Sequence, residues 1–119
     1  QKDIVAVQLA KAAIRAGSEL LLSSAGVEYA DLEKVVIAGA FGSSLNLKSA
    51  ISLGLLPAAN PKIFHNIGNA AGAGARLMLL SGKERRLAEE ISTKVRYIEL
   101  AANSKFASEF ARALEFGRA

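Results

Sequence analysis

Gly39, Ala40 and Gly42 are the residues whose types and spacing most clearly suggest ligand chemistry. They follow the apolar run 35–38, which is typical of a short buried strand. In open α/β sheets, ligands sit just beyond the carboxyl ends of strands, where bare backbone can approach them closely. A second strand, predicted at 62–67, also runs into glycines. Two such junctions favour one shared cleft that binds a nucleotide, although a tight turn without a ligand would use the same glycines.

Asn69 begins the helix that the sequence predicts over residues 69–81. Exposed amides and the helix dipole favour anionic or polar groups at such a terminus, but a simple N-cap explains an asparagine equally well. Gly72 and Gly74 lie inside this helix, and together they cost on the order of 1–2 kcal/mol relative to alanine. We therefore expect another backbone, or a ligand, to pack against this small face.

Gln8, Lys11 and Arg15 share one face of a long helix predicted over residues 3–24. This face is either a binding surface or an ordinary solvated stripe. The predicted buried face of the same helix consists of apolar residues at spacings of three or seven, namely Ile4, Val7, Ile14 and Leu21. We expect Asp3 to cap the start of the helix and Gly26 to cap its end.

Well-known phosphate-binding fingerprints are absent from the sequence. The segment 39–44 lacks the Gly-Lys-Ser/Thr of a P-loop, and Leu77 stands where a dinucleotide fingerprint starting at 72 needs glycine or alanine. Asp31, Glu33 and His65 form no acid–base or metal-binding constellation by spacing. The sequence therefore predicts binding, and we assign no catalytic and no metal-ligating residue.

The order of elements predicts an α/β fold with a small three-stranded sheet and about five helices, forming one domain over residues 1–119. Besides the elements above, we expect a third strand at 95–100 and helices at 47–53, 83–94 and 104–116, with Gly82 as a helix breaker. The last helix is expected to turn four residues inward, namely Phe106, Phe110, Ala113 and Leu114.

Composition excludes several classes of protein. Apolar residues make up 51% of the chain, which excludes disorder, and the absence of cysteine excludes disulfides and thiolate-bound clusters within these residues. The net charge of +4 is spread over segments that also carry acids, so we expect a solvated surface and no nucleic-acid partner. No apolar run approaches the roughly 20 residues of a membrane span. We expect a cytoplasmic protein without a membrane partner, cut from a longer chain.

The run 35–42, followed by Leu45-Asn46, resembles the adenosine motif of the actin/Hsp70/sugar-kinase ATPase superfamily. More closely, the chain resembles the C-terminal part of reductive activators of corrinoid proteins. These are iron–sulfur proteins that couple ATP to the reduction of an inactivated cobalamin cofactor in methyltransferase systems. The matching segments span nearly the whole chain in order, namely 7–17, 38–42, 54–57, 68–75 and 99–100, with Phe106 and Phe110.

The resemblance implies part of a ribonuclease-H-like, actin-like ATPase fold. It implies that Gly39, Ala40 and Gly42 line the adenosine and phosphate side of a nucleotide cleft. Gln8, Lys11 and Arg15 would then lie on the helix that flanks the adenine and ribose in related ATPases, so we include them with Asn69 among the nucleotide-binding residues. The glycines of 68–74 would let two helices cross closely at a hinge.

The resemblance also implies that other parts of the family lie outside this chain. Its [2Fe–2S] cluster needs four cysteines, and its phosphate loops and magnesium-binding acids belong to a preceding half. We therefore expect ATP, with magnesium in the full-length protein, as cofactor and a corrinoid protein as partner. We also expect that this chain alone folds but neither transfers electrons nor hydrolyses ATP efficiently. The alternative is a non-catalytic docking or dimerisation domain that binds the corrinoid protein or a second copy.

Overall fold

The computed structural model describes residues 1–115, apart from the side chain of Phe41. These residues group into two compact units. Unit 1 comprises residues 1–35, residues 46–63 and the described residues from 98 onward, and unit 2 comprises residues 36–45 and 64–97. The chain therefore passes from one unit to the other four times. The prediction of one domain over the whole chain stays a prediction.

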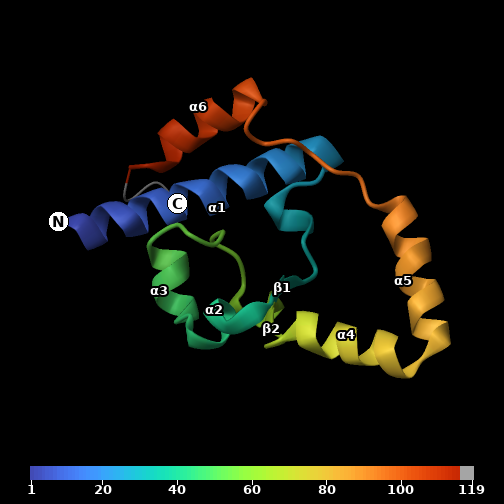
Figure 1. Cartoon of the computed structure of the whole chain (residues 1–119). Coiled ribbons are helices and arrows are strands. Elements are labelled where there is room, and N and C mark those ends of the chain that lie inside the picture. The colour runs from blue at the N-terminus through green and yellow to red at the C-terminus, as the bar shows by residue number, and fades with distance from the viewer. Residues whose placement is uncertain (116–119) are drawn as a thin grey trace. The chain divides into compact units, whose positions relative to one another are not determined.

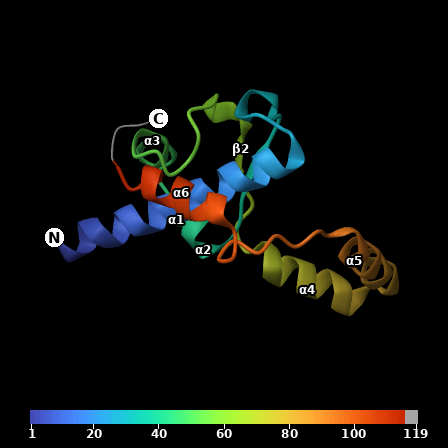
Figure 2. The same ribbon diagram turned by 90° about the horizontal axis from the view of Figure 1, so that it is seen from above.

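Unit 1 is built on the packing of α6 (Ser104–Ala113) along α1 (Lys2–Ala25), which both views show (Figure 1 and Figure 2). The stripe of α1 that is buried contains Ala12 and Ala16, both without exposed surface, and Leu20. Small side chains at these positions allow the two helix backbones to approach closely. Gly17 lies in the same stripe, and a Cβ there would stand 3.7 Å from Leu100 Cδ1.

The predicted buried face of α1 is wrong. Ile4 is 58% exposed and Leu21 is 54% exposed, and Val7 and Ile14 are also exposed. The spacing of the apolar residues alone predicted that this face is buried. In the structure, α6 packs instead against the face of α1 that carries Ala12 and Ala16. Asp3 does not cap the helix either, because α1 begins at Lys2 with Gln1 as its N-cap residue. The predicted C-cap is confirmed, since Gly26 has φ 68° and its amide donates to carbonyls of the last turn.

The rest of unit 1 consists of short elements. They are a 3₁₀ helix at Tyr29–Asp31, α3 (Leu47–Ser52) and a 3₁₀ helix at Pro61–Ile63. Asn46 caps α3 because its side-chain oxygen accepts from the amide of Ser49 at 2.9 Å. Ala50 and Leu55 are buried and belong to the small core of this unit.

Unit 2 contains two strands, each followed by a helix. The Ile37 carbonyl accepts from the Ile67 amide at 3.0 Å, and the Gly68 carbonyl accepts from the Gly39 amide at 2.6 Å. Residue numbers rise together along the two strands, so the pair is parallel. The elements that make up this unit are β1 (Val35–Ile37, which starts at the unit boundary), α2 (Gly39–Ser44), β2 (Phe64–Asn66), α4 (Ala70–Leu80) and α5 (Gly82–Lys94).

The predicted third strand and the helix count need correction. The described residues form two strands and six α-helices, not three strands and about five helices, and residues 95–100 belong to neither. Val95 is 68% exposed and Tyr97 is 79% exposed. Valine, tyrosine and isoleucine in this segment are typical of strands, but a strand forms only where a sheet edge can pair with it. This segment instead links the two units at residues 97 and 98.

Two predicted helix ends also differ from the structure. Gly82 is the first residue of α5 and not a breaker, because Ser81 ends α4 and its hydroxyl accepts from the Glu84 amide at 3.3 Å. The last helix ends at Ala113, and Phe116, where we expected it to end, lies outside the described residues. The inward face of this helix is confirmed, since its four predicted residues are half-buried and the Phe106 and Phe110 rings lie 6.0 Å apart.

Candidate functional site

Gly39, Ala40 and Gly42 lie where β1 ends in unit 2. The prediction of a turn over these residues is wrong, because they form the first turn of the short helix α2. Ala38 is still extended, and Gly39 has φ 88°, a backbone conformation that disfavours residues with a side chain. Ala40 is exposed and Gly42 is buried. The chain thus changes from strand to helix at one glycine, which brings the α2 amides to the strand end.

The second strand ends beside the first. Besides its backbone bond to Gly39, Gly68 has φ 58° and donates its amide to Asn66 Oδ1 at 2.9 Å. The Asn66 amide nitrogen in turn donates to the Gly42 carbonyl. Asn66 therefore ties the end of β2 to the first turn of α2. Reasoning from the sequence missed this role of Asn66, although an asparagine two residues before a glycine at a strand end was a usable signal.

Asn69 is the N-cap of α4, which is the simpler of the two interpretations that the sequence left open. Its Oδ1 accepts from the Gly72 amide at 2.9 Å. A Cβ on Gly72 would lie 2.6 Å from Asn69 Nδ2, so the absence of a side chain at 72 makes room for this cap. Gly74 faces open space, with no atom within 4 Å of a Cβ placed there. Within the described residues, the small face of α4 therefore has a partner only at its cap.

Gln8 and Lys11 of α1 both bind the C-terminal end of α6, within unit 1. Gln8 Nε2 donates to the Leu114 carbonyl at 3.5 Å, and Lys11 Nζ donates to the Glu115 carbonyl at 2.5 Å. A cation suits this position because the carbonyls at a helix C-terminus carry partial negative charge. Lys11 is only 3% exposed. Its burial, and then the nearby Arg15, lower the pKa of the Lys11 ammonium.

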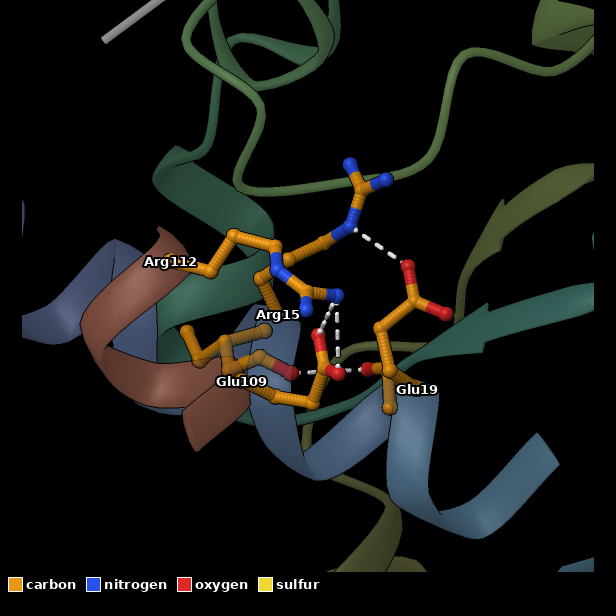
Figure 3. Close-up of polar contacts among 6 residues, drawn as sticks. Arg15, Glu19, Glu109 and Arg112 are labelled. Atoms are coloured by element: carbon orange, nitrogen blue, oxygen red, sulfur yellow. Dashed lines mark hydrogen bonds and ion pairs between the residues drawn. The ribbon is translucent and has the colours of Figure 1, made fainter. Parts of the chain in front are cut away.

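Arg15 lies on the same face of α1 but points into an open pocket (Figure 3). Its Nε lies 3.0 Å from Glu19 Oε1, and its guanidinium lies 5.4 Å from the centre of the Tyr29 ring. The pocket also contains Lys105, Glu109 and Arg112 from α6. Reasoning from the sequence missed these three residues, because their relation to Arg15 depends on how α6 packs on α1.

Tyr29 offers a pH-dependent test of this part of unit 1. Burial raises the pKa of Tyr29 to about 12, the charge of Glu19 adds to the increase, and Arg15 opposes it. Since the unfolded chain loses the phenol proton first, near the ordinary value of 10.0, Tyr29 stabilises the fold below that pH. The contribution is lost as the pH rises toward 12. In an ultraviolet titration of the tyrosine hydroxyls, Tyr29→Phe should remove the absorbance change that occurs at the highest pH. An absorbance change at that pH that persists in the variant would contradict the assignment of the raised pKa to Tyr29.

The predicted nucleotide-binding residues fall into two sets. Gly39, Ala40, Gly42 and Asn69 belong to unit 2, and Gln8, Lys11 and Arg15 belong to unit 1. Among the described residues there is no group of three or more histidine, aspartate or glutamate side chains that could hold a metal ion. In the same part of the chain, no helix combines the length and the apolar character that crossing a membrane requires.

Comparison with known proteins gives consistent matches. A family model described as the C-terminal domain of RACo, the ASKHA domain, matches residues 1–119. The corrinoid activation enzyme RamQ of Eubacterium limosum is 44% identical over 117 residues, or 98% of this chain and 20% of that protein. The Co(II) methylated amine-specific corrinoid protein reductase of Methanosarcina barkeri is 33% identical over 95 residues, or 80% of this chain and 17% of that protein.

A solved structure is also similar to this chain. It is a reductive activator for corrinoid, iron–sulfur protein, with a TM-score of 0.84 and 39% sequence identity. The match covers 92% of this chain and 18% of that one. The chain therefore spans about a fifth of the length of the proteins that it matches.

Proposed function

Because this chain belongs to the family of C-terminal RACo domains, the ASKHA domains, we propose that it is the nucleotide-binding C-terminal part of an ATP-dependent reductive activator of a corrinoid protein. Gly39, Ala40 and Gly42 contact the adenosine and phosphate side of the nucleotide, and Asn69 lies at the second strand end. The parent protein acts on the corrinoid protein of a methyltransferase system in the cytoplasm.

The start of α2 is the observation that carries this proposal. Ala38 has no side-chain oxygen that could accept from the first amides of α2, and no side-chain cap is present. The four helices α3 to α6 are each capped by the side chain of an asparagine or serine, whereas α1, like α2, has no side-chain cap. The Gly39 amide already donates to the Gly68 carbonyl. The amides that follow it in α2 have no side-chain cap, so they can bind an oxygen of a phosphate or a ribose in place of water.

The open backbone at Gly39 fits the same ligand. A Cβ placed on Gly39 would meet no atom within 4 Å, so this position leaves space in front of the strand end. Bound ATP would supply the free energy that drives reduction of the corrinoid in the parent protein. The role of these residues is to bind and orient the nucleotide, because none of them carries a group that could transfer a proton.

Further nucleotide contacts are proposed at Gln8, Lys11 and Arg15. These residues differ in which of their present contacts nucleotide binding would break. Lys11 and Gln8 would have to release the carbonyls at the end of α6. Arg15 would have to release only side-chain contacts, the ion pair with Glu19 and the stacking on Tyr29, and it lines an open pocket. We therefore expect Arg15 to be the most available of the three.

The iron–sulfur cluster and the magnesium site are proposed to lie in the remaining four-fifths of the parent protein. This chain contains no cysteine that could hold a [2Fe–2S] cluster. The names of the relatives, a corrinoid activation enzyme and a corrinoid protein reductase, support a corrinoid protein as the partner of the parent.

A nuclear magnetic resonance titration of the ¹⁵N-labelled chain with MgATP tests the nucleotide site. We expect saturable shifts of the amides of 39–42 and 69–72, and weaker binding with smaller shifts when inorganic tripolyphosphate is added at the same ionic strength. The tripolyphosphate control separates nucleotide recognition from general attraction to a basic chain. If the folded chain shows no saturable shift at these amides, the proposed site is wrong.

Exposed apolar residues favour a second candidate function, docking of the corrinoid protein or of a second copy. α4 is apolar around most of its circumference and yet has no buried residue within the described chain. Leu79 and Leu80 are each 77% exposed, and Leu87 and Ile91 of α5 are exposed as well. Helices of this composition are normally covered. Docking without nucleotide binding predicts that MgATP leaves the strand-end amides unchanged.

A further inference from the structure

A pocket lies between α1 and α6. It has a volume of about 380 Å³ and lies entirely within unit 1. Cavities of roughly 300–1,000 Å³ are typical of sites for small molecules. Its floor is formed by the half-buried Ala113 of α6, and beneath it Ala16 and Leu20 of α1 are 0% and 6% exposed.

Charged side chains from both helices surround this floor. On α1, Arg15 pairs with Glu19, and on α6, Arg112 Nη1 lies 3.0 and 3.2 Å from the two carboxylate oxygens of Glu109 (Figure 3). Each pair joins residues of one helix, so neither pair links α1 to α6. The centre of the pocket is therefore open to a ligand that contacts both helices.

Lys105 gives the pocket its excess of positive charge. The walls of the pocket carry three cationic side chains, namely Arg15, Arg112 and Lys105, and only two carboxylates. The Lys105 ammonium has no hydrogen-bond or ion-pair partner among the residues that the structure describes. Arg112 is 66% exposed, and its pair with Glu109 is of the weak, solvent-screened kind that a ligand can displace. Two cationic groups on α6 are thus available to an anion.

We propose that this pocket binds a small organic monocarboxylate. Lys105 and Arg112 hold the carboxylate, and the apolar part of the ligand contacts the half-buried Ala113. One negative charge matches the single excess positive charge of the walls. A dianion such as a phosphate monoester would place its second charge against Glu19 and Glu109. The site shares Arg15 with the proposed nucleotide contacts, but neither Lys105 nor Arg112, which would hold the carboxylate, takes part in that proposal.

Titration of the ¹⁵N-labelled chain with sodium benzoate tests the site, since benzoate has one carboxylate on a compact apolar body. We expect saturable amide shifts confined to residues 15–23 of α1 and 105–113 of α6. Benzyl alcohol, which has the same ring without the charge, should give no saturable shift. Phenyl phosphate should bind more weakly than benzoate.

Lys105→Met should weaken benzoate binding about tenfold, because it removes a charge-assisted hydrogen bond and keeps the length of the side chain. Lys48→Met, on α3 of the same unit and outside the pocket, should leave the affinity unchanged. Arg112→Met provides a second variant and should also weaken binding. Equal affinities for the Lys105 and Lys48 variants, no response to benzoate, or tighter binding of phenyl phosphate would overturn the proposal. Loss of the MgATP response alone would not affect it.

Discussion

Replacing Gly42 with alanine is expected to destabilise unit 2 by about 1–3 kcal/mol, as overpacking of a close contact does. A Cβ at this position would lie only 2.6 Å from Ile37 Cγ2, and 3.5 Å from the Ile37 carbonyl carbon. The Ile37 methyl group is attached directly to a β-branched carbon, so it cannot rotate away as the end of a long side chain would. Either β1 or the first turn of α2 must therefore move.

Gly74→Ala is the matched control for this prediction. It is the same substitution in the same unit, but a Cβ there would meet no atom within 4 Å. Because Gly74 lies in the interior of α4, alanine is expected to stabilise the chain by roughly 0.5–1 kcal/mol. Urea denaturation followed by circular dichroism gives both values. Equal effects of the two substitutions would show that the contact between Gly42 and Ile37 is not tight in solution.

Gly39→Val is expected to weaken MgATP binding at least about tenfold. Gly39 has φ 88°, a conformation that costs a β-branched residue on the order of 1–3 kcal/mol. The space in front of Gly39 is open, so the valine side chain would also occupy the region where the nucleotide is proposed to bind. Backbone strain and lost space therefore act in the same direction. Isothermal titration calorimetry of the wild-type chain and the variant measures the effect.

Gly26→Val separates these two causes. Gly26 also has a positive φ, 68°, and open space around a Cβ, but it ends α1 in unit 1. Valine there should destabilise the fold by backbone strain while the affinity for MgATP stays unchanged. If Gly39→Val leaves binding intact in a folded chain, Gly39 serves only as a turn residue and the proposed nucleotide site fails.

Several local elements and the family could be predicted from the sequence alone, whereas the predicted turn at 39–42, third strand at 95–100 and cap at Asp3 were wrong. The apolar run 35–37 is a strand, Asn69 and Gly26 cap the helices that they were expected to cap, and the chain belongs to the family that its motifs resemble. These features depend on neighbours within a few residues or on a linear motif. Hydrophobic runs, caps and glycines act locally, so their effects can be predicted without knowledge of the packing.

Only the tertiary structure decided which faces are used. The apolar period of α1 predicted Ile4 and Leu21 inside, whereas α6 covers Ala12 and Ala16 instead. Lys11 was predicted to lie in a polar stripe, but in the structure it is buried and donates a hydrogen bond to the Glu115 carbonyl. The segment 95–100 is rich in residues typical of strands but pairs with no edge in the described chain. Packing between segments that are about 100 residues apart decides which face of α1 is buried. A periodic pattern in one helix does not show which other segment will pack against it.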